Sequence, residues 1–217
     1  MPIRVIIADD HAIVREGIRA LLEKKVREIV ISGEASDGKG LLELARKKPA
    51  DVYVLDIAMP GLNGIETAAR LKRLDKNARI IYLSMYNDKP TVQKALETGA
   101  QGYLLKENTA EDIVKAIRAV YGGGYYLSAA LSGFMLDRLH ASPGSSLKGD
   151  VSSRLTPKER EIIQLIAEGL ADKDISRRLK ISCNTVHAHR NNISRKLDIH
   201  KQTDLVRYAI KEKIAVV

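Results

Sequence analysis

Five polar side chains in the first half of the sequence each come at the end of a short apolar run. Asp9 and Asp10 end RVIIADD, Asp56 ends VYVLD, Ser84 ends RIIYLS, and Lys106 follows GYLL. A buried, unpaired charge costs several kcal/mol, so Asp56 must reach a crevice or be held by a cation. A hard divalent cation with oxygen ligands, most simply Mg²⁺, would neutralise three neighbouring carboxylates and keep a position for a phosphoryl oxygen.

This set of groups suits a phosphoryl group on Asp56. A carboxylate is a covalent phosphoryl acceptor, the cation and the Lys106 ammonium would stabilise the phosphoryl oxygens, and Ser84 offers a hydroxyl donor. The same groups do not suit hydride or acyl transfer. Taken singly, they could be strand-end acids, a solvated lysine and a turn serine. Their joint appearance at four strand ends favours a site.

The elements around these residues alternate between strand and helix. Apolar runs predict five short strands, in RVIIADD, EIVISGEA, VYVLDI, RIIYLS and GYLL. Segments with helical spacing lie between them, such as 12–25 and 109–123, the latter with Thr109 as its expected N-cap. This alternation indicates an α/β fold, a (βα)5 doubly wound parallel sheet covered on both faces. The five side chains should then converge on one crevice at the carboxyl ends of the strands.

The pattern changes after Leu127. Residues 128–153 are rich in Ser, Gly and Ala and contain Pro143 followed by Gly144, which is typical of a linker. A short helix is expected within the linker, from the spacing of Leu131, Phe134, Met135 and Leu139. Residues 154–217 lack strand-like alternation and divide into four helical segments. The sequence therefore predicts domains at 1–127 and 154–217, the second small and all-α.

The second domain has the order of a helix-turn-helix. Thr156, Pro157 and Glu159 form the pattern of a capping box at a helix start. A short helix, ADKDISRRL, is then followed by the turn KIS and a longer helix, CNTVHAHRNNISRKL. On the longer helix we expect an inward stripe made of Val186, Ile193 and Leu197.

Charge is concentrated in the second domain. Residues 154–217 carry 14 Lys/Arg and 8 Asp/Glu, so they hold +6 of the chain's net charge of +9. Such a local excess is the footprint of a nucleic-acid-binding module, although a solvated basic surface would look the same. The apolar runs are shorter than a membrane span and the N-terminus does not resemble a signal peptide, so we expect a cytoplasmic protein without a membrane partner. The single Cys183 excludes an internal disulfide, and we expect it to be inert.

Several motifs resemble those of a known family. Residues 1–127 resemble a response-regulator receiver domain at ADDH, LDIAMPGLNGIE, YLS and GYLLK, and residues 154–217 resemble the LuxR-type helix-turn-helix. Together they resemble the NarL/FixJ class of two-component response regulators. The resemblance implies a flavodoxin-like strand order 2-1-3-4-5 in the receiver. It also implies a sensor histidine kinase and double-stranded DNA as partners, a homodimer after phosphorylation, and RNA polymerase as a further candidate partner.

The resemblance assigns roles in the receiver. Asp56 is the phosphoacceptor, Ser84 and Lys106 contact the phosphoryl group, and Tyr103 is the aromatic that changes exposure together with Ser84. The Mg²⁺ ligands that it implies are Asp9, Asp10, Asp56 and the backbone carbonyl of Ala58.

The expected DNA contacts form two sets. Cations that should contact the DNA backbone are Lys173, Arg177, Arg190, Arg195 and Lys196. Side chains that should face base edges are His187, Ala188 and Asn191. Two of these depart from the family: His187 stands where Lys is most frequent, and Asn191 replaces a frequently basic position. No target sequence can therefore be transferred from relatives.

Two other classes of protein compete with a transcriptional regulator. An enzyme with an aspartyl-phosphate intermediate usually has a second acid two residues beyond the nucleophile, where this chain has Ala58. A ligand-sensing LuxR-type regulator needs an apolar, aromatic-lined pocket, and residues 1–127 contain neither Trp nor Phe. The sequence thus favours a phosphorylation-controlled DNA-binding regulator that is not itself an enzyme.

Overall fold

The computed structural model describes residues 1–107, 110–131 and 155–215. The chain divides into two compact units, Met1–Ser142 and Pro143–Val217, and the division falls inside the predicted linker. The expected N-cap Thr109 and the expected linker helix at Phe134, Met135 and Leu139 lie outside the described residues. Leu131 ends a short 3-10 helix, Ala129–Leu131.

The first unit is built on one parallel sheet. Its strands are β1 (Ile3–Ala8), β2 (Ile29–Ala35), β3 (Val52–Asp56), β4 (Ile80–Ser84), β5 (Gly102–Leu105) and β6 (Tyr126–Leu127). The order is β2-β1-β3-β4-β5-β6, and every neighbouring pair is parallel. The predicted order 2-1-3-4-5 is confirmed. Strand β6 is an addition, because a run of two residues gives no periodic signal in the sequence.

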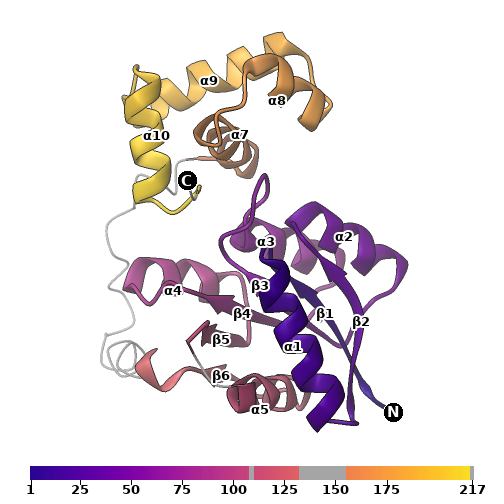
Figure 1. The fold of residues 1–217 in the computed structure, drawn as a ribbon. Helices are drawn as coiled ribbons and strands as arrows, with labels where there is room; N and C mark the ends of the chain where they lie inside the picture. The colour runs from indigo at the N-terminus through magenta and orange to yellow at the C-terminus, as the bar shows by residue number, and fades with distance from the viewer. Residues whose placement is uncertain (108–109, 132–154, 216–217) are drawn as a thin grey trace. The chain divides into compact units, whose positions relative to one another are not determined.

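Helices cover both faces of this sheet, as Figure 1 shows. Helices α1 (Ala12–Lys25) and α5 (Ala110–Tyr121) pack on one face, and α2 (Gly38–Lys47), α3 (Gly64–Leu74) and α4 (Lys89–Glu97) pack on the other. Strand β3 is apolar throughout because both of its faces are covered. Val52 and Val54 lie in the core beneath α1 and α5, whereas Tyr53 and Leu55 lie in the core beneath α2, α3 and α4. Each such fully buried side chain contributes about 1.5–3 kcal/mol.

Side-chain caps fix where three helices begin. Asp37, Asn63 and Asp88 precede α2, α3 and α4, and each side chain accepts a hydrogen bond from a backbone N–H three residues on. Each cap stabilises its helix by about 1 kcal/mol. The starts of α3 and α4 are therefore fixed a few residues after the ends of β3 and β4, where the site lies.

The second unit consists of four described helices around one core. They are α7 (Pro157–Ala167), α8 (Asp172–Leu179), α9 (Cys183–Leu197) and α10 (Gln202–Lys211). The predicted capping box is present: the Thr156 hydroxyl accepts from the Glu159 N–H, and the Glu159 carboxylate accepts from the Thr156 N–H. Val186 and Ile193 are fully buried and Leu197 packs against them, as predicted.

The turn between α8 and α9 is tight. Lys180 closes α8 in the left-handed region, with φ of 54°, and Ser182 caps α9 by accepting from the Thr185 N–H. This short helix, turn and longer helix make the helix-turn-helix that the sequence predicts. None of the helices in the described ranges has the length and apolar character needed to span a membrane.

Candidate functional site

The carboxyl ends of four strands carry the predicted receiver residues. Asp56 and Ser84 are the last residues of β3 and β4, while Asp9 and Lys106 come directly after β1 and β5. Asp9, Asp56 and Ser84 are at most 2% exposed. The parallel sheet thus places these buried polar groups at one edge.

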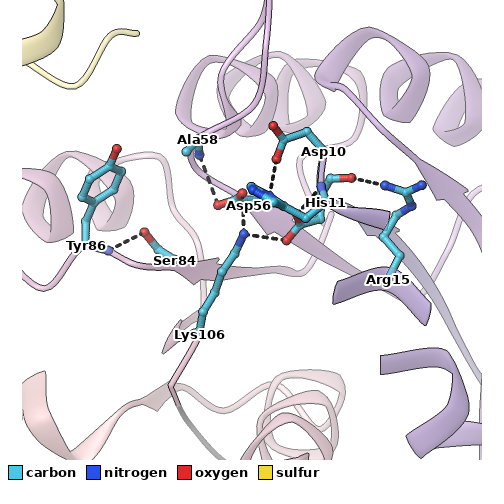
Figure 2. Close-up of polar contacts among 9 residues, drawn as sticks. Asp10, His11, Arg15, Asp56, Ala58, Ser84, Tyr86 and Lys106 are labelled. Carbon is cyan, nitrogen blue, oxygen red and sulfur yellow. Dashed lines mark hydrogen bonds and ion pairs between the residues drawn. The ribbon is translucent and has the colours of Figure 1, made fainter. Parts of the chain in front are cut away.

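Lys106 joins two of the carboxylates. Its Nζ lies 2.7 Å from Asp56 Oδ2 and 2.8 Å from Asp9 Oδ2 (Figure 2). The other oxygen of Asp56, Oδ1, accepts a hydrogen bond from the backbone N–H of Ala58 at 3.2 Å. Two buried carboxylates therefore share one ammonium, which leaves an excess negative charge before the exposed Asp10 is counted.

Burial and pairing shift the pKa values of this pair. Burial raises the pKa of the Asp56 carboxyl, and the hydrogen bond and charge of Lys106 oppose that rise only in part. Burial by itself would lower the pKa of Lys106, but its close polar contacts with the Asp56 and Asp9 carboxylates outweigh burial, so the net pKa is raised. Lys106 therefore keeps its proton and its charge at neutral pH.

The donor set fits a hard divalent cation. Asp9, Asp10, His11 and Asp56 each offer a ligand atom, and these atoms lie within 4.8 Å of one another. Asp9 Oδ2 is buried and finds no partner with hydrogen-bond geometry among the described residues, although the Lys106 ammonium lies close to it. Carboxylate oxygens gathered in this way are the ligands that hard divalent cations prefer.

His11 and Arg15 belong to this edge of the sheet, although neither was among the predicted site residues. His11 Nδ1 lies 2.7 Å from Asp10 Oδ1 and 3.2 Å from Asp9 Oδ1. Arg15 donates from Nη1 to the backbone carbonyl of Asp9 at 2.6 Å (Figure 2). Both side chains brace the loop that carries the two acids. Only the position of His11, directly after Asp10, signals this in the sequence.

Tyr86 connects Ser84 with Tyr103. Its backbone N–H donates to Ser84 Oγ at 3.0 Å, and its carbonyl accepts from the Tyr103 hydroxyl at 2.8 Å. Tyr103 is fully buried, and burial raises the pKa of its hydroxyl group. The predicted switch residue thus lies inside the core, and it touches the segment that follows β4 rather than solvent.

Gly64 allows the first turn of α3 to press against the end of β3. A Cβ on Gly64 would lie 2.0 Å from the carbonyl oxygen of Asp56, and the Gly64 N–H donates to the Ile57 carbonyl at 2.9 Å. Any side chain here would push against backbone. The loop between Asp56 and Gly64 therefore owes its close return to this glycine.

The second unit presents a polar surface on α8 and α9. Residues of the predicted DNA-contacting set that are exposed are Lys173, Arg177, His187, Ala188, Asn191 and Arg195. Arg190 and Lys196 are half-buried. The helix-turn-helix thus brings the predicted set onto two successive helices.

Several of these side chains are engaged within the domain. Lys196 Nζ lies 2.7 and 2.9 Å from the two oxygens of Glu159, a residue only 3% exposed. Arg190 Nη1 and His187 Nε2 lie 2.7 and 2.8 Å from the two oxygens of Asp172. Their partners stand 37, 18 and 15 positions away in the sequence, so sequence spacing gave no sign of these pairs.

Two family models match the chain. The model described as response regulator receiver domain matches residues 5–118, and the model described as bacterial regulatory proteins, luxR family, matches residues 153–209. These ranges contain the acidic edge of the sheet and the helix-turn-helix, respectively.

Curated relatives match along the whole length. The chain is 36% identical over 213 residues to the nitrate/nitrite response regulator protein NarL of Escherichia coli K12, covering 98% of this chain and 97% of that protein. It is 39% identical over 207 residues to the transcriptional regulatory protein LiaR of Bacillus subtilis 168, covering 95% of this chain and 96% of that protein.

Solved structures agree with this. An RcsB response regulator of Salmonella typhimurium aligns with a TM-score of 0.64 and 29% identity over 99% of each chain. The two-component response regulator RcsB in complex with DNA aligns with a TM-score of 0.59 and 29% identity, covering 96% of this chain and 98% of that one. The chain belongs to the NarL/FixJ class of two-component response regulators, in which a receiver domain is joined to a LuxR-type DNA-binding helix-turn-helix domain.

Proposed function

We propose that Asp56 accepts a phosphoryl group in a Mg²⁺-dependent reaction and that phospho-Asp56 controls DNA binding by the second domain. The observation that carries the proposal is the buried pair of carboxylates, Asp56 and Asp9, that share the Lys106 ammonium at the edge of the sheet. The phosphodonor is a sensor histidine kinase, as the receiver domain implies, and the reaction takes place in the cytoplasm.

The site residues have separate roles in the phosphoryl transfer. One oxygen of Asp56 attacks the phosphorus of the donor, an O–P bond forms, and the bond between phosphorus and the donor's leaving group breaks. Mg²⁺ bound by Asp9, Asp10, Asp56 and the Ala58 carbonyl would neutralise the carboxylates and the phosphoryl oxygens. Lys106 already lies 2.7 Å from Asp56 and supplies a second positive charge to the transferred group.

Ser84 connects the chemistry to a conformational change. Its hydroxyl oxygen accepts from the Tyr86 N–H, and Tyr86 in turn accepts from Tyr103. When the Ser84 side chain turns to donate to a phosphoryl oxygen, its Oγ moves away from the Tyr86 N–H, and the segment after β4 loses this anchor. Tyr86 and Tyr103 must then repack, which alters the surface next to α4 and favours a homodimer.

DNA recognition falls to α8 and α9. The exposed cations Lys173, Arg177 and Arg195 supply sequence-independent contacts to phosphates, and Ala188 and Asn191 face base edges. His187 and Arg190 contribute subject to their pairing with Asp172. Lys196 was predicted to contact phosphates, and we now assign it a structural role because Glu159 holds its ammonium.

Intact-mass measurement tests the phosphoacceptor. The full chain incubated with acetyl phosphate and Mg²⁺ should gain one phosphoryl group, and Asp56→Asn should gain none. Asp75→Asn is the matched control, because Asp75 is an exposed acid at the end of α3 and should label like the parent. Full labelling of Asp56→Asn would refute the assignment.

Dimerisation is tested on the same samples. The labelled chain should show a higher oligomeric mass by light scattering than the unlabelled chain. Hydrogen exchange should rise or fall around Tyr86 and α4 on labelling. If oligomeric mass and exchange were identical with and without the phosphoryl group, the proposed coupling through Ser84 would be wrong.

A further inference from the structure

We propose that Asp172 is a specificity-determining residue of the DNA-binding surface, a carboxylate that withholds Arg190 from the DNA phosphates and also pairs with His187. The inference rests on the assignment of α9 as the helix that reads DNA. It concerns a residue that is acidic, lies on the preceding helix, and was not among the predicted DNA contacts.

The geometry uses both oxygens of Asp172. Oδ1 accepts from Arg190 Nη1 at 2.7 Å, and Oδ2 lies 2.8 Å from His187 Nε2. His187 and Arg190 are three residues apart on α9, so they share one face of the helix. One carboxylate in the first turn of α8 therefore pairs with two neighbouring side chains of α9, the proposed recognition helix.

Arg190 is held at a second point. Its Nη2 donates to the side-chain oxygen of Gln202 at 3.2 Å, at the start of α10. The Arg190 side chain is 28% exposed and that of Asp172 is 25% exposed, so solvent screens this pair less than a fully exposed one. Arg190 is thus fixed between α8 and α10 rather than free to follow a DNA strand.

This pairing weakens non-specific DNA binding, the part of the affinity that does not depend on base sequence. Contacts from Lys and Arg to phosphates supply most non-specific binding, whereas contacts to base edges supply specificity. A phosphate that approached Arg190 would have to displace Asp172 and would meet its negative charge. Lys173 and Arg177 stay exposed on α8 to hold the DNA backbone. Placing a repulsive group against unwanted partners is a general way to gain specificity.

The test compares two duplexes with the full-length chain. One duplex has random sequence, and the other is selected by the parent protein from a random pool. Asp172→Asn should bind the random duplex about five- to tenfold more tightly, the size of one added charge-assisted hydrogen bond. Its plot of log affinity against log salt should steepen by about 0.9, the value for one further phosphate contact. Affinity for the selected duplex should change less, so the ratio between the two duplexes falls.

Two further variants make the result decisive. Asp172→Ala also removes both acceptor oxygens and should lower the ratio at least as far. Asp204→Asn is the matched control, because it deletes one negative charge in the same domain while its partner, Arg207, is outside the predicted DNA set. It should leave the salt slope unchanged.

Each outcome decides one claim. Unchanged binding in Asp172→Asn, or equal weakening on both duplexes, would overturn the role of Asp172 and leave DNA binding itself intact. The same salt slope in Asp172→Asn and Asp204→Asn would reduce the effect to net charge and also overturn it. If the parent protein bound none of the duplexes, the assignment of α9 as the DNA-reading helix would itself be wrong.

Discussion

Lys196, in the last turn of the recognition helix, donates to the buried carboxylate of Glu159 at the start of α7, with Nζ 2.7 Å from Oε2. The same carboxylate accepts from the Thr156 N–H at 2.7 Å and so completes the capping box. One acidic side chain therefore links the first helix of the domain to the end of α9. This ion pair thus holds the end of α9 to the start of α7.

The pair predicts that Lys196 contributes to stability rather than to DNA affinity. Lys196→Ala should lower the free energy of opening of the second domain by about 1–2 kcal/mol, because Glu159 loses a charged hydrogen-bond partner in a site that excludes most water. Hydrogen exchange of the α7 and α9 amides measures this. The salt slope of DNA binding should stay that of the parent.

Lys173→Ala is the matched control for this prediction. Lys173 is exposed on α8, so its removal should flatten the salt slope by about 0.9 and leave hydrogen exchange unchanged. If Lys196→Ala behaved like Lys173→Ala in both measurements, Glu159 would not hold Lys196 in solution, and the original expectation of a phosphate contact would return.

Glu159 should also make the second domain sensitive to acid. Burial by itself would raise its pKa, but hydrogen bonds from Lys196 and from Thr156 outweigh burial, so the pKa lies below the ordinary 4.5. A group whose pKa is depressed by folding stabilises the folded state above its unfolded pKa and loses that contribution as the pH falls through its folded pKa. The stabilisation should thus be complete above about pH 5 and decline below 4.5.

A comparison with Glu159→Gln measures this contribution. The parent should exceed the variant in opening free energy at pH 6 to 7, and the difference should shrink as the pH is lowered toward 3. A difference that stayed constant over this range would show that the carboxylate's charge is not what stabilises the domain, and that the capping hydrogen bonds alone act.

How much of this structure the sequence predicts depends on how far apart in the chain the interacting residues lie. Asp56, Ser84 and Lys106 were found because each ends or follows an apolar run that forms a strand, and parallel strands bring their carboxyl ends together. The capping box at Thr156 was found because its two partners are three residues apart. Both signals lie within one element or at its end.

The remainder depends on contacts between distant segments. Asp172 meets His187, and Glu159 meets Lys196, only after the helices pack. Tyr86 joins the site through its backbone N–H and carbonyl, which are groups that every residue but proline carries. Residue type and spacing hold no record of such contacts, so the pairing of the predicted cations could not be foreseen.

Lys106 competes with a cation for the acidic edge. It already lies 2.8 Å from Asp9 Oδ2 and 2.7 Å from Asp56 Oδ2. Removing the ammonium in Lys106→Met should tighten Mg²⁺ binding on the order of tenfold, because one positive charge no longer repels the ion. Calorimetric titration with Mg²⁺ measures this.

The same variant should be less stable when no divalent cation is present, since its two buried carboxylates lose their counter-charge. Lys115→Met is the control, as Lys115 is an exposed cation on α5 whose side chain is 61% exposed. It should leave Mg²⁺ affinity unchanged. Weaker Mg²⁺ binding in Lys106→Met than in the control would show that Lys106 organises the carboxylates instead of competing for them.

Replacing either of two glycines by alanine should change the stability of the receiver domain, in opposite directions. In Gly64→Ala the new Cβ would lie 2.0 Å from the Asp56 carbonyl oxygen and 2.9 Å from Ile57 Cα, both of them backbone atoms that cannot turn aside. The first turn of α3 must then move away from β3, which should destabilise the receiver domain by about 2–4 kcal/mol. It should also slow labelling of Asp56 by acetyl phosphate.

In Gly17→Ala, on the exposed face of α1, the Cβ meets nothing within 4 Å, and the receiver domain should gain about 0.5–1 kcal/mol of stability. Urea unfolding of both variants measures the change, and a Gly64→Ala protein as stable and as readily labelled as Gly17→Ala would mean that the loop after Asp56 does not need the close contact at Gly64.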